Sequence, residues 1–178
     1  MLRTGDESAV SIRAIADAVG VTAPSIYLHF ADKTELLFAV CERHFGALDE
    51  AMQQAAVGCD SAAERLYHRG RAYIEFGLAN PEHYRILFMG RPEIAPVGFM
   101  GDRLLRTAAF GHLSEDVQAA MDAGEIAGDD AYIVACGLWM TVHGITSLVI
   151  AKPDFPWPPI DQLIEHMLAA HGRGIFNR

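Results

Sequence analysis

The longest uncharged stretch of the chain most limits how it can fold. Residues 131–151 run for twenty-one positions without Asp, Glu, Lys or Arg, which is long enough for a helix to cross a bilayer. Two threonines, a histidine and a serine lie in its middle, charged residues bracket it, and the sequence has no second such span. We therefore expect a helix buried on nearly all sides of a globular fold, with no membrane partner.

The spacing of apolar residues sets the fold class. The chain has 178 residues, of which 51% are hydrophobic, enough for one well-buried domain or two small ones and too apolar for a disordered chain. Apolar positions recur at intervals of three and four, whereas alternating runs of Val, Ile and Thr between hairpin turns are missing. An all-α fold follows.

Capping residues and helix breakers predict where the helices begin and end. Ser11 begins a short helix that Gly20 ends, and Thr22 caps a second one. Asp32 and Glu35 have capping-box spacing and open a long helix that reaches about residue 58. Prolines and glycines predict a loop over residues 90–98. Further helices are expected over residues 61–79, 81–89, 99–123, 131–151 and from 160 onward.

Cysteine and charge patterns exclude several classes of function. The three cysteines lack C-x-x-C spacing, so neither a disulfide framework nor a metal site is expected, and no cofactor motif is present. Cys41 has His44 one turn on but no third group to orient it, so we expect no enzyme activity. The first residues lack the apolar region of a signal peptide, which favours a cytoplasmic location.

Residues 11–37 carry the most specific motif of the chain. An Ile15-Ala16 pair, a Gly20-Val21 turn, Tyr27-x-x-Phe30 and Lys33 follow in order. This block closely resembles the DNA-binding signature of the tetracycline-repressor-like (TetR/AcrR) family. The resemblance implies a helix-turn-helix DNA-binding domain over residues 1–45 and a ligand-binding and dimerisation domain over residues 46–178. It also implies an obligate homodimer that binds double-stranded operator DNA.

The second helix of this block supplies the expected contacts with DNA. The resemblance implies that side chains projecting from it face the major groove, where hydroxyl, imidazole and ammonium groups can donate to phosphates. Ile26 and Phe30 are expected in the core. Two alternatives stay open: Tyr27 packs beside Phe30, and Lys33 is an ordinary solvated residue. The expected DNA-binding residues are Thr22, Ala23, Ser25, Tyr27, His29 and Lys33.

Two features of the first 45 residues depart from the family pattern. Four basic and six acidic side chains give this part a net charge of −2, within −9 for the whole chain, which suits a phosphate-binding face poorly. The family places a full helix before residue 11, for which ten residues are too few. Three explanations are open: the native chain begins upstream, the preceding stretch was disordered and is missing from this sequence, or DNA binding has degenerated. We favour the first two.

A second motif lies in the uncharged segment. Trp139-x-x-x-His143-Gly144 resembles the signature of one carboxy-terminal ligand-binding subclass of the family. The helix face that carries Trp139 and His143 could line an apolar cavity together with aromatic residues from other helices. The alternative reading makes the aromatics ordinary core and His143 a core histidine bonded to a backbone carbonyl. The expected pocket residues are Tyr73, Phe76, Tyr84, Phe88, Phe110, Trp139, Val142, His143 and Thr146.

Small residues at intervals of seven mark another face of the same segment, where two backbones can approach closely. The expected partner is the same helix of a second copy, together with the apolar stripe of the last helix, in a four-helix interface. The expected interface residues are Gly137, Met140, Gly144, Ser147, Ala151, Ile160, Leu163, Ile164, Met167 and Leu168.

The sequence therefore favours a homodimeric transcriptional regulator, a repressor in the leading interpretation, that binds DNA through a helix-turn-helix. A small apolar or amphipathic effector in the carboxy-terminal domain would release the protein or modulate its binding. The alternative is a helical dimer that binds small molecules and has lost DNA binding. The identity of the effector is not encoded in any motif we found.

Overall fold

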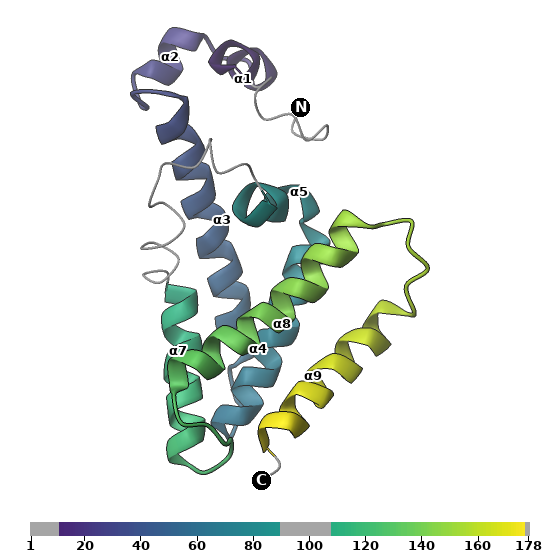
Figure 1. Ribbon diagram of the computed structural model, residues 1–178. Coiled ribbons are helices and arrows are strands. Elements are labelled where there is room, and N and C mark those ends of the chain that lie inside the picture. Colours follow the sequence, from purple (N-terminus) through teal and green to yellow (C-terminus); the bar gives the residue numbers. More distant parts are fainter. Residues whose placement is uncertain (1–10, 90–107, 177–178) are drawn as a thin grey trace.

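The computed structural model describes residues 11–89 and 108–176, and every regular element in these ranges is helical. Figure 1 shows a long helix, α3, with two short helices at one end and the remaining helices bundled around the other. This arrangement confirms the all-α prediction. The elements are α1 (Ile12–Val19), α2 (Ala23–Tyr27), α3 (Lys33–Ala55), α4 (Ala62–Ala79), α5 (Pro81–Tyr84), η3 (Arg85–Met89), α7 (Ala108–Asp122), α8 (Ala131–Ala151) and α9 (Ile160–Phe176).

The small unit formed by α1 and α2 is defined by its caps. The Ser11 hydroxyl accepts a hydrogen bond from Ala14 N at 3.1 Å, and Thr22 Oγ1 accepts one from Ser25 N at 3.3 Å. Gly20 ends α1 at φ 74°, a left-handed conformation that glycine adopts without a Cβ penalty. Ile12, Ala16 and Ile26 form the buried core of this unit.

The long helix α3 connects this unit to the rest of the molecule. It begins after Asp32, whose carboxylate accepts a hydrogen bond from Glu35 N at 2.8 Å, as the capping-box spacing predicted. The helix crosses residue 45, the expected domain boundary, without interruption. One uninterrupted helix therefore links α1 and α2 to the carboxy-terminal bundle.

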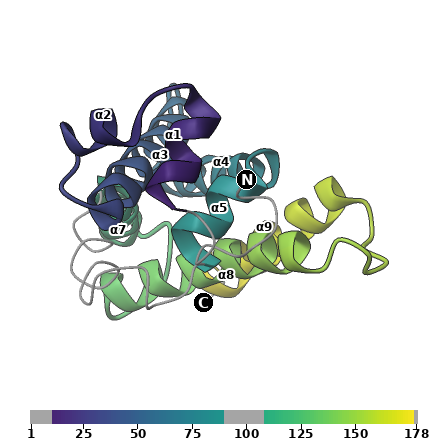
Figure 2. The ribbon, with the colours of Figure 1, turned by 90° about the horizontal axis from the view of Figure 1, so that it is seen from above.

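Helix α4 is the centre of the carboxy-terminal bundle and packs against α3, α7, α8 and α9. Figure 2 shows α8 and α9 on the side of the molecule opposite α2. Two clusters of buried side chains fill the bundle: one joins α3, α4, α8 and α9 around Ile74, and the other joins α4, α7 and α8 around Val117.

Helix α8 departs from the expectation that it would be buried on nearly all sides. It is long and apolar enough to cross a membrane by length and composition, and one face does pack against α4 and α7. On the other face Ile133, Met140 and Leu148 are 67%, 68% and 54% exposed. The prediction was wrong for the single chain, because the helices around α8 cover only one of its faces.

Two other expected segments changed in detail. The short helix predicted over residues 81–89 is divided into α5 and the π-helical turn η3. The predicted helix over residues 99–123 is seen from Ala108 to Asp122. Its beginning and the predicted loop over residues 90–98 lie outside the described residues.

Candidate functional site

The six residues expected to contact DNA lie in or next to α2. Thr22, Tyr27 and His29 are exposed, whereas Ala23, Ser25 and Lys33 are half-buried. The Thr22 and Ser25 hydroxyl oxygens lie 2.7 Å apart, so one of these two hydroxyls donates to the other. The capping role of Thr22 therefore coexists with its exposure on the expected DNA-facing side.

The structure brings three of these residues together in a surface groove between α1, α2 and the start of α3. Ala23, Tyr27 and Lys33 line it, together with Ser11, Ile12, Arg13 and Pro24. Sequence reasoning had not assigned Arg13 to the site. The sequence feature that could have identified Arg13 is its position in the first turn of α1, close to the cap residue Ser11 and next to the buried Ile12. The groove has two basic side chains, Arg13 and Lys33, in a part of the chain that is acidic in total.

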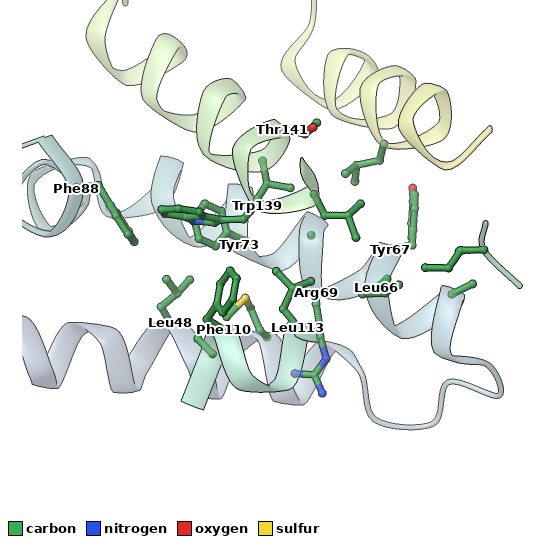
Figure 3. A pocket seen from close by; sticks show the side chains of 18 of the residues that line it. Leu48, Leu66, Tyr67, Arg69, Tyr73, Phe88, Phe110, Leu113, Trp139 and Thr141 are labelled. Atoms are coloured by element: carbon green, nitrogen blue, oxygen red, sulfur yellow. The ribbon is translucent and has the colours of Figure 1, made fainter. Parts of the chain in front are cut away.

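A second candidate site is a cavity inside the carboxy-terminal bundle. Its volume is about 110 Å³, and its wall is contributed by α3, α4, η3, α7, α8 and α9. Figure 3 shows the rings of Tyr73, Phe110 and Trp139 near one another, and Leu66 and Leu113 also line the cavity. A mostly apolar wall with few polar groups is typical of sites for small apolar ligands.

Five of the nine expected pocket residues line this cavity: Tyr73, Phe88, Phe110, Trp139 and Val142. The other four, Phe76, Tyr84, His143 and Thr146, lie outside its wall. Thr146 is fully buried and donates from its hydroxyl to the Val142 carbonyl oxygen at 2.8 Å. Leu48 and Met52 of α3 and Leu66 of α4 were missed, because an apolar stripe in sequence does not distinguish cavity wall from solid core.

A hydrogen-bonded group of two tyrosines and a histidine lies behind the aromatic wall. His143 Nδ1 lies 2.6 Å from the Tyr84 hydroxyl and 3.3 Å from the Tyr73 hydroxyl, and these hydroxyls are 3.1 Å apart. His143 is therefore bonded to tyrosine, and the alternative of a backbone carbonyl partner was wrong. Burial raises the pKa of Tyr73 to about 12, also raises that of Tyr84, and lowers that of His143. All three groups are consequently neutral near pH 7.

One edge of the cavity is charged. Arg69 belongs to the lining, and its Nε lies 2.7 Å from Asp116 Oδ2 on α7. Arg65 Nε donates to the other carboxylate oxygen of Asp116, also at 2.7 Å. This edge was not foreseen, because the pairing joins residues far apart in the sequence. No three His, Cys, Asp or Glu side chains that could hold a metal ion gather within residues 11–89 and 108–176.

The residues expected at a dimer interface divide into two groups. A Cβ added at Gly137 or Gly144 would meet nothing within 4 Å, and Met140 and Ala151 are exposed. On α9, by contrast, Ile164 is 1% exposed and belongs to the chain's own core, where Ile160 and Leu168 pack beside it. Most of the apolar stripe of α9 therefore packs in the core of the same chain. Of the remaining expected interface residues, Ser147 on α8 and Leu163 on α9 are half-buried, and Met167 on α9 is exposed.

Comparison with known proteins agrees with this architecture. Residues 66–171 match the family described as tetracyclin repressor-like, C-terminal domain, and residues 6–40 match the family described as bacterial regulatory proteins, tetR family. The first match alone covers more than half of the chain. The chain therefore belongs to the tetR family of transcriptional regulators.

Individual relatives support the family assignment. The HTH-type transcriptional activator FasR of Mycolicibacterium smegmatis is 30% identical over 106 residues, which is 57% of this chain and 48% of FasR. The chain thus matches about half the length of this curated relative. A Rhodococcus protein of unknown function is 25% identical, with a TM-score of 0.80 over 99% of this chain and 90% of its own. The regulator FadR of Bacillus subtilis, solved with stearoyl-CoA, has the same fold at 18% identity, with a TM-score of 0.77 over 94% of this chain and 90% of FadR.

Proposed function

We propose that this protein is a ligand-responsive transcriptional repressor that binds operator DNA as a homodimer and responds to a long apolar effector in the bundle cavity. The observation that carries the proposal is the combination of a capped helix-turn-helix at one end of α3 and an apolar cavity lined by the other end. A single helix thereby connects the two sites. We place the protein in the cytoplasm, where operator DNA is found.

The proposed DNA contact is the groove lined by Arg13, Tyr27 and Lys33. Side chains of this kind position a protein on phosphates, and each released counterion makes binding weaker at higher salt. Each subunit offers few such groups, so the contacts of both subunits must add up for firm binding. This requires two DNA half-sites whose centres lie about 34–36 Å apart, or a multiple of that distance. Symmetric duplexes should therefore bind much better than single half-sites.

Selection of duplexes from random DNA, followed by titration at several salt concentrations, tests this role. Binding should fall linearly on a logarithmic salt scale, and Lys33→Ala should reduce the steepness. Lys152→Ala is the matched control, because Lys152 is exposed at the end of α8, far along the chain from the groove. Retention of no duplex by the wild type would instead favour the alternative, a helical ligand-binding dimer without DNA binding.

The effector is proposed to be an apolar molecule such as the acyl chain of a long-chain thioester. Such a chain must widen the cavity of about 110 Å³ to enter, because ligand pockets usually hold about 300–1,000 Å³. The cavity wall is mostly apolar, and two hydroxyl groups of its lining already donate elsewhere: Thr141 donates to the Gly137 carbonyl, and Tyr67 donates to Glu165. FadR, which shares the fold, was solved with stearoyl-CoA. Stearoyl-CoA should therefore raise the melting temperature and change Trp139 fluorescence, whereas free coenzyme A should do neither.

The homodimer is proposed to form through the exposed face of α8. Gly137 and Gly144 leave open space there, and Met140 is exposed beside them. Gly144→Leu should overpack the contact and yield monomer by light scattering. Gly46→Leu on α3 is the control, since it is also an open helical position. A stable Gly144→Leu dimer would refute this face as the interface.

We also propose that Trp139, His143 and Gly144 place the carboxy-terminal domain in the Trp-x-x-x-His-Gly subclass of the family. What supports this is the packing of the two aromatic members: the centroids of the Trp139 and His143 rings lie 5.6 Å apart, and the His143 ring stacks on Tyr84 at 5.6 Å. In this interpretation Trp139 belongs to the cavity wall, His143 packs behind it, and Gly144 leaves open space on the exposed face of α8.

A further inference from the structure

A polar cluster joins three helices at the edge of the cavity. Gln53 lies on α3, Arg65 and Arg69 on α4, and His112 and Asp116 on α7. Arg69 Nη2 donates to Gln53 Oε1 at 3.1 Å, and the Gln53 amide nitrogen contacts His112 Nδ1. Gln53 is therefore a shared partner of α4 and α7, located on the helix that carries the helix-turn-helix.

Arg69 belongs to the cavity wall and to this cluster at the same time. Its side chain lines the cavity, but Figure 3 shows its guanidinium pointing away from the rings of Tyr73 and Trp139. The aliphatic part of the side chain therefore faces an occupant, while the charged end holds Gln53 and Asp116. A molecule that fills the cavity must contact this stem.

The hydrogen bonding of the cluster is incomplete. Arg69 Nε and Nη1 and Asp116 Oδ2 are buried and have no hydrogen-bond partner among the described residues. The 2.7 Å approach of Arg69 Nε to Asp116 Oδ2 is thus an ion pair without good alignment. Two guanidinium groups also share one carboxylate. A small rotation of Arg69 can therefore exchange its hydrogen bond to Gln53 for an aligned bond to Asp116, which would satisfy a buried donor and a buried acceptor that are unmet now.

We propose that Arg69 is the residue that transmits occupancy of the cavity to α3, through its hydrogen bond to Gln53. An occupant displaces the Arg69 stem. The guanidinium then turns toward Asp116, because an aligned charge-assisted hydrogen bond to a carboxylate is stronger than one to a neutral amide. The hydrogen bond between Gln53 and Arg69 is lost. Gln53 and Asp49 of α3 keep their contacts with His112 of α7, but α3 loses this bond to α4 and is loosened at the end opposite the helix-turn-helix. This role of Arg69 rests on the proposed function for its biological meaning and describes how the effector site regulates DNA binding.

Gln53→Leu tests the role with little risk to folding, since it removes the hydrogen bond from Arg69 to α3 and leaves two contacts in place, the ion pair of Arg69 with Asp116 and the contact of His112 with Asp49. Gln54→Leu is the matched control, because Gln54 is the next residue of α3 and is exposed. In the wild type and in Gln54→Leu, stearoyl-CoA should change duplex affinity by about fivefold or more. In Gln53→Leu the change should disappear, while the affinity for stearoyl-CoA stays close to that of the wild type.

A purely structural role for Gln53 would lower stability without altering this coupling. Loss of the coupling in Gln53→Leu alone supports the proposal. Coupling that survives in Gln53→Leu overturns it, and so does equal loss in both variants. Arg65→Met, Arg69→Met and Asp116→Leu combined replace the two guanidinium groups and the carboxylate that they share by apolar side chains, which proteins often tolerate. This triple variant should also abolish the coupling.

A second arm needs neither DNA nor a known effector. Leu113 lines the cavity from α7, so Leu113→Trp, or the smaller Leu113→Phe, fills it from within. The Leu113 substitution is made in three backgrounds: the wild type, Gln54→Leu and Gln53→Leu. It should speed deuterium uptake by α3 in the first two and leave the rate of uptake unchanged in Gln53→Leu. The same increase in all three backgrounds overturns the proposal. If the wild type binds neither stearoyl-CoA nor DNA, the proposed function fails, and this arm still decides the role of Arg69.

Discussion

The two ends of α3 are stabilised in different ways. At the amino-terminal end, three buried side chains form the core of α1 and α2, and hydroxyl caps hold the short helices. Leu28 remains 83% exposed there. At the other end, two larger clusters join helices far apart in the sequence, yet they enclose a cavity. We call α1, α2 and the start of α3 the reading end, for its proposed contact with DNA, and the bundle of α4 to α9 around the far end of α3 the sensing end, for its proposed effector cavity. The reading end depends on local contacts, whereas the sensing end depends on long-range packing.

Matched isoleucine truncations should separate the two ends most clearly. Ile74 is fully buried at the centre of the bundle, so Ile74→Ala should lower the free energy of unfolding by about 2–5 kcal/mol. Ile26→Ala, in the small core, should leave the main unfolding transition nearly unchanged and abolish duplex binding. Urea titration followed by circular dichroism measures both. A large loss of bundle stability in Ile26→Ala would show that the two ends unfold as one unit.

Glycine substitutions probe how tightly the bundle is packed beside its cavity. A Cβ at Gly77 would lie 2.4 Å from Thr146 Cγ2 and 2.8 Å from the Tyr84 ring, so Gly77→Ala should cost about 1–3 kcal/mol by overpacking. Gly46→Ala on α3 has open space and should stabilise the protein by about 0.5–1 kcal/mol through helix propensity. Thermal unfolding compares the two. Equal effects would contradict the tight contact of α4 with α8.

Acid should weaken the sensing end more than the reading end. Burial lowers the pKa of His143 in the folded state, so the unfolded chain binds this proton first. Stability should therefore fall as the pH drops below about 6.5. His143→Gln should flatten this dependence, whereas His68→Gln, on α4, is the control. Urea titrations at pH values between about 5 and 8 measure how the free energy of unfolding changes with pH. An unchanged pH dependence in His143→Gln would exclude His143 as its source.

The smallest effect is expected at the caps of the reading end. Thr22→Ala removes the acceptor for Ser25 N and should cost the small unit about 1 kcal/mol. Thr34→Ala, an exposed threonine in the first turn of α3, is the control. Limited proteolysis between α1 and α3 should be faster only in Thr22→Ala. Equal rates would mean that packing of Ile26, and not the cap, holds α2.

The reading end could be predicted almost residue by residue. Caps, breakers and the left-handed Gly20 act within a few positions of the chain, so Ser11, Thr22 and Asp32 marked helix starts that the structure confirms. The cavity could be predicted only in part. Tyr73, Phe88 and Trp139 were found as its aromatic wall, but Arg69 was missed, because its partner Asp116 lies on another helix.

The sequence by itself determined the helices, their caps and the order of the reading and sensing ends, because these depend on interactions between near neighbours in the chain. Only the tertiary structure decided which apolar side chains line a cavity, which face of α8 is left exposed and which charged groups meet at the cavity edge. The physical reason is that packing and ion pairing depend on the angles between helices, and periodicity in one helix carries no information about the position of the next.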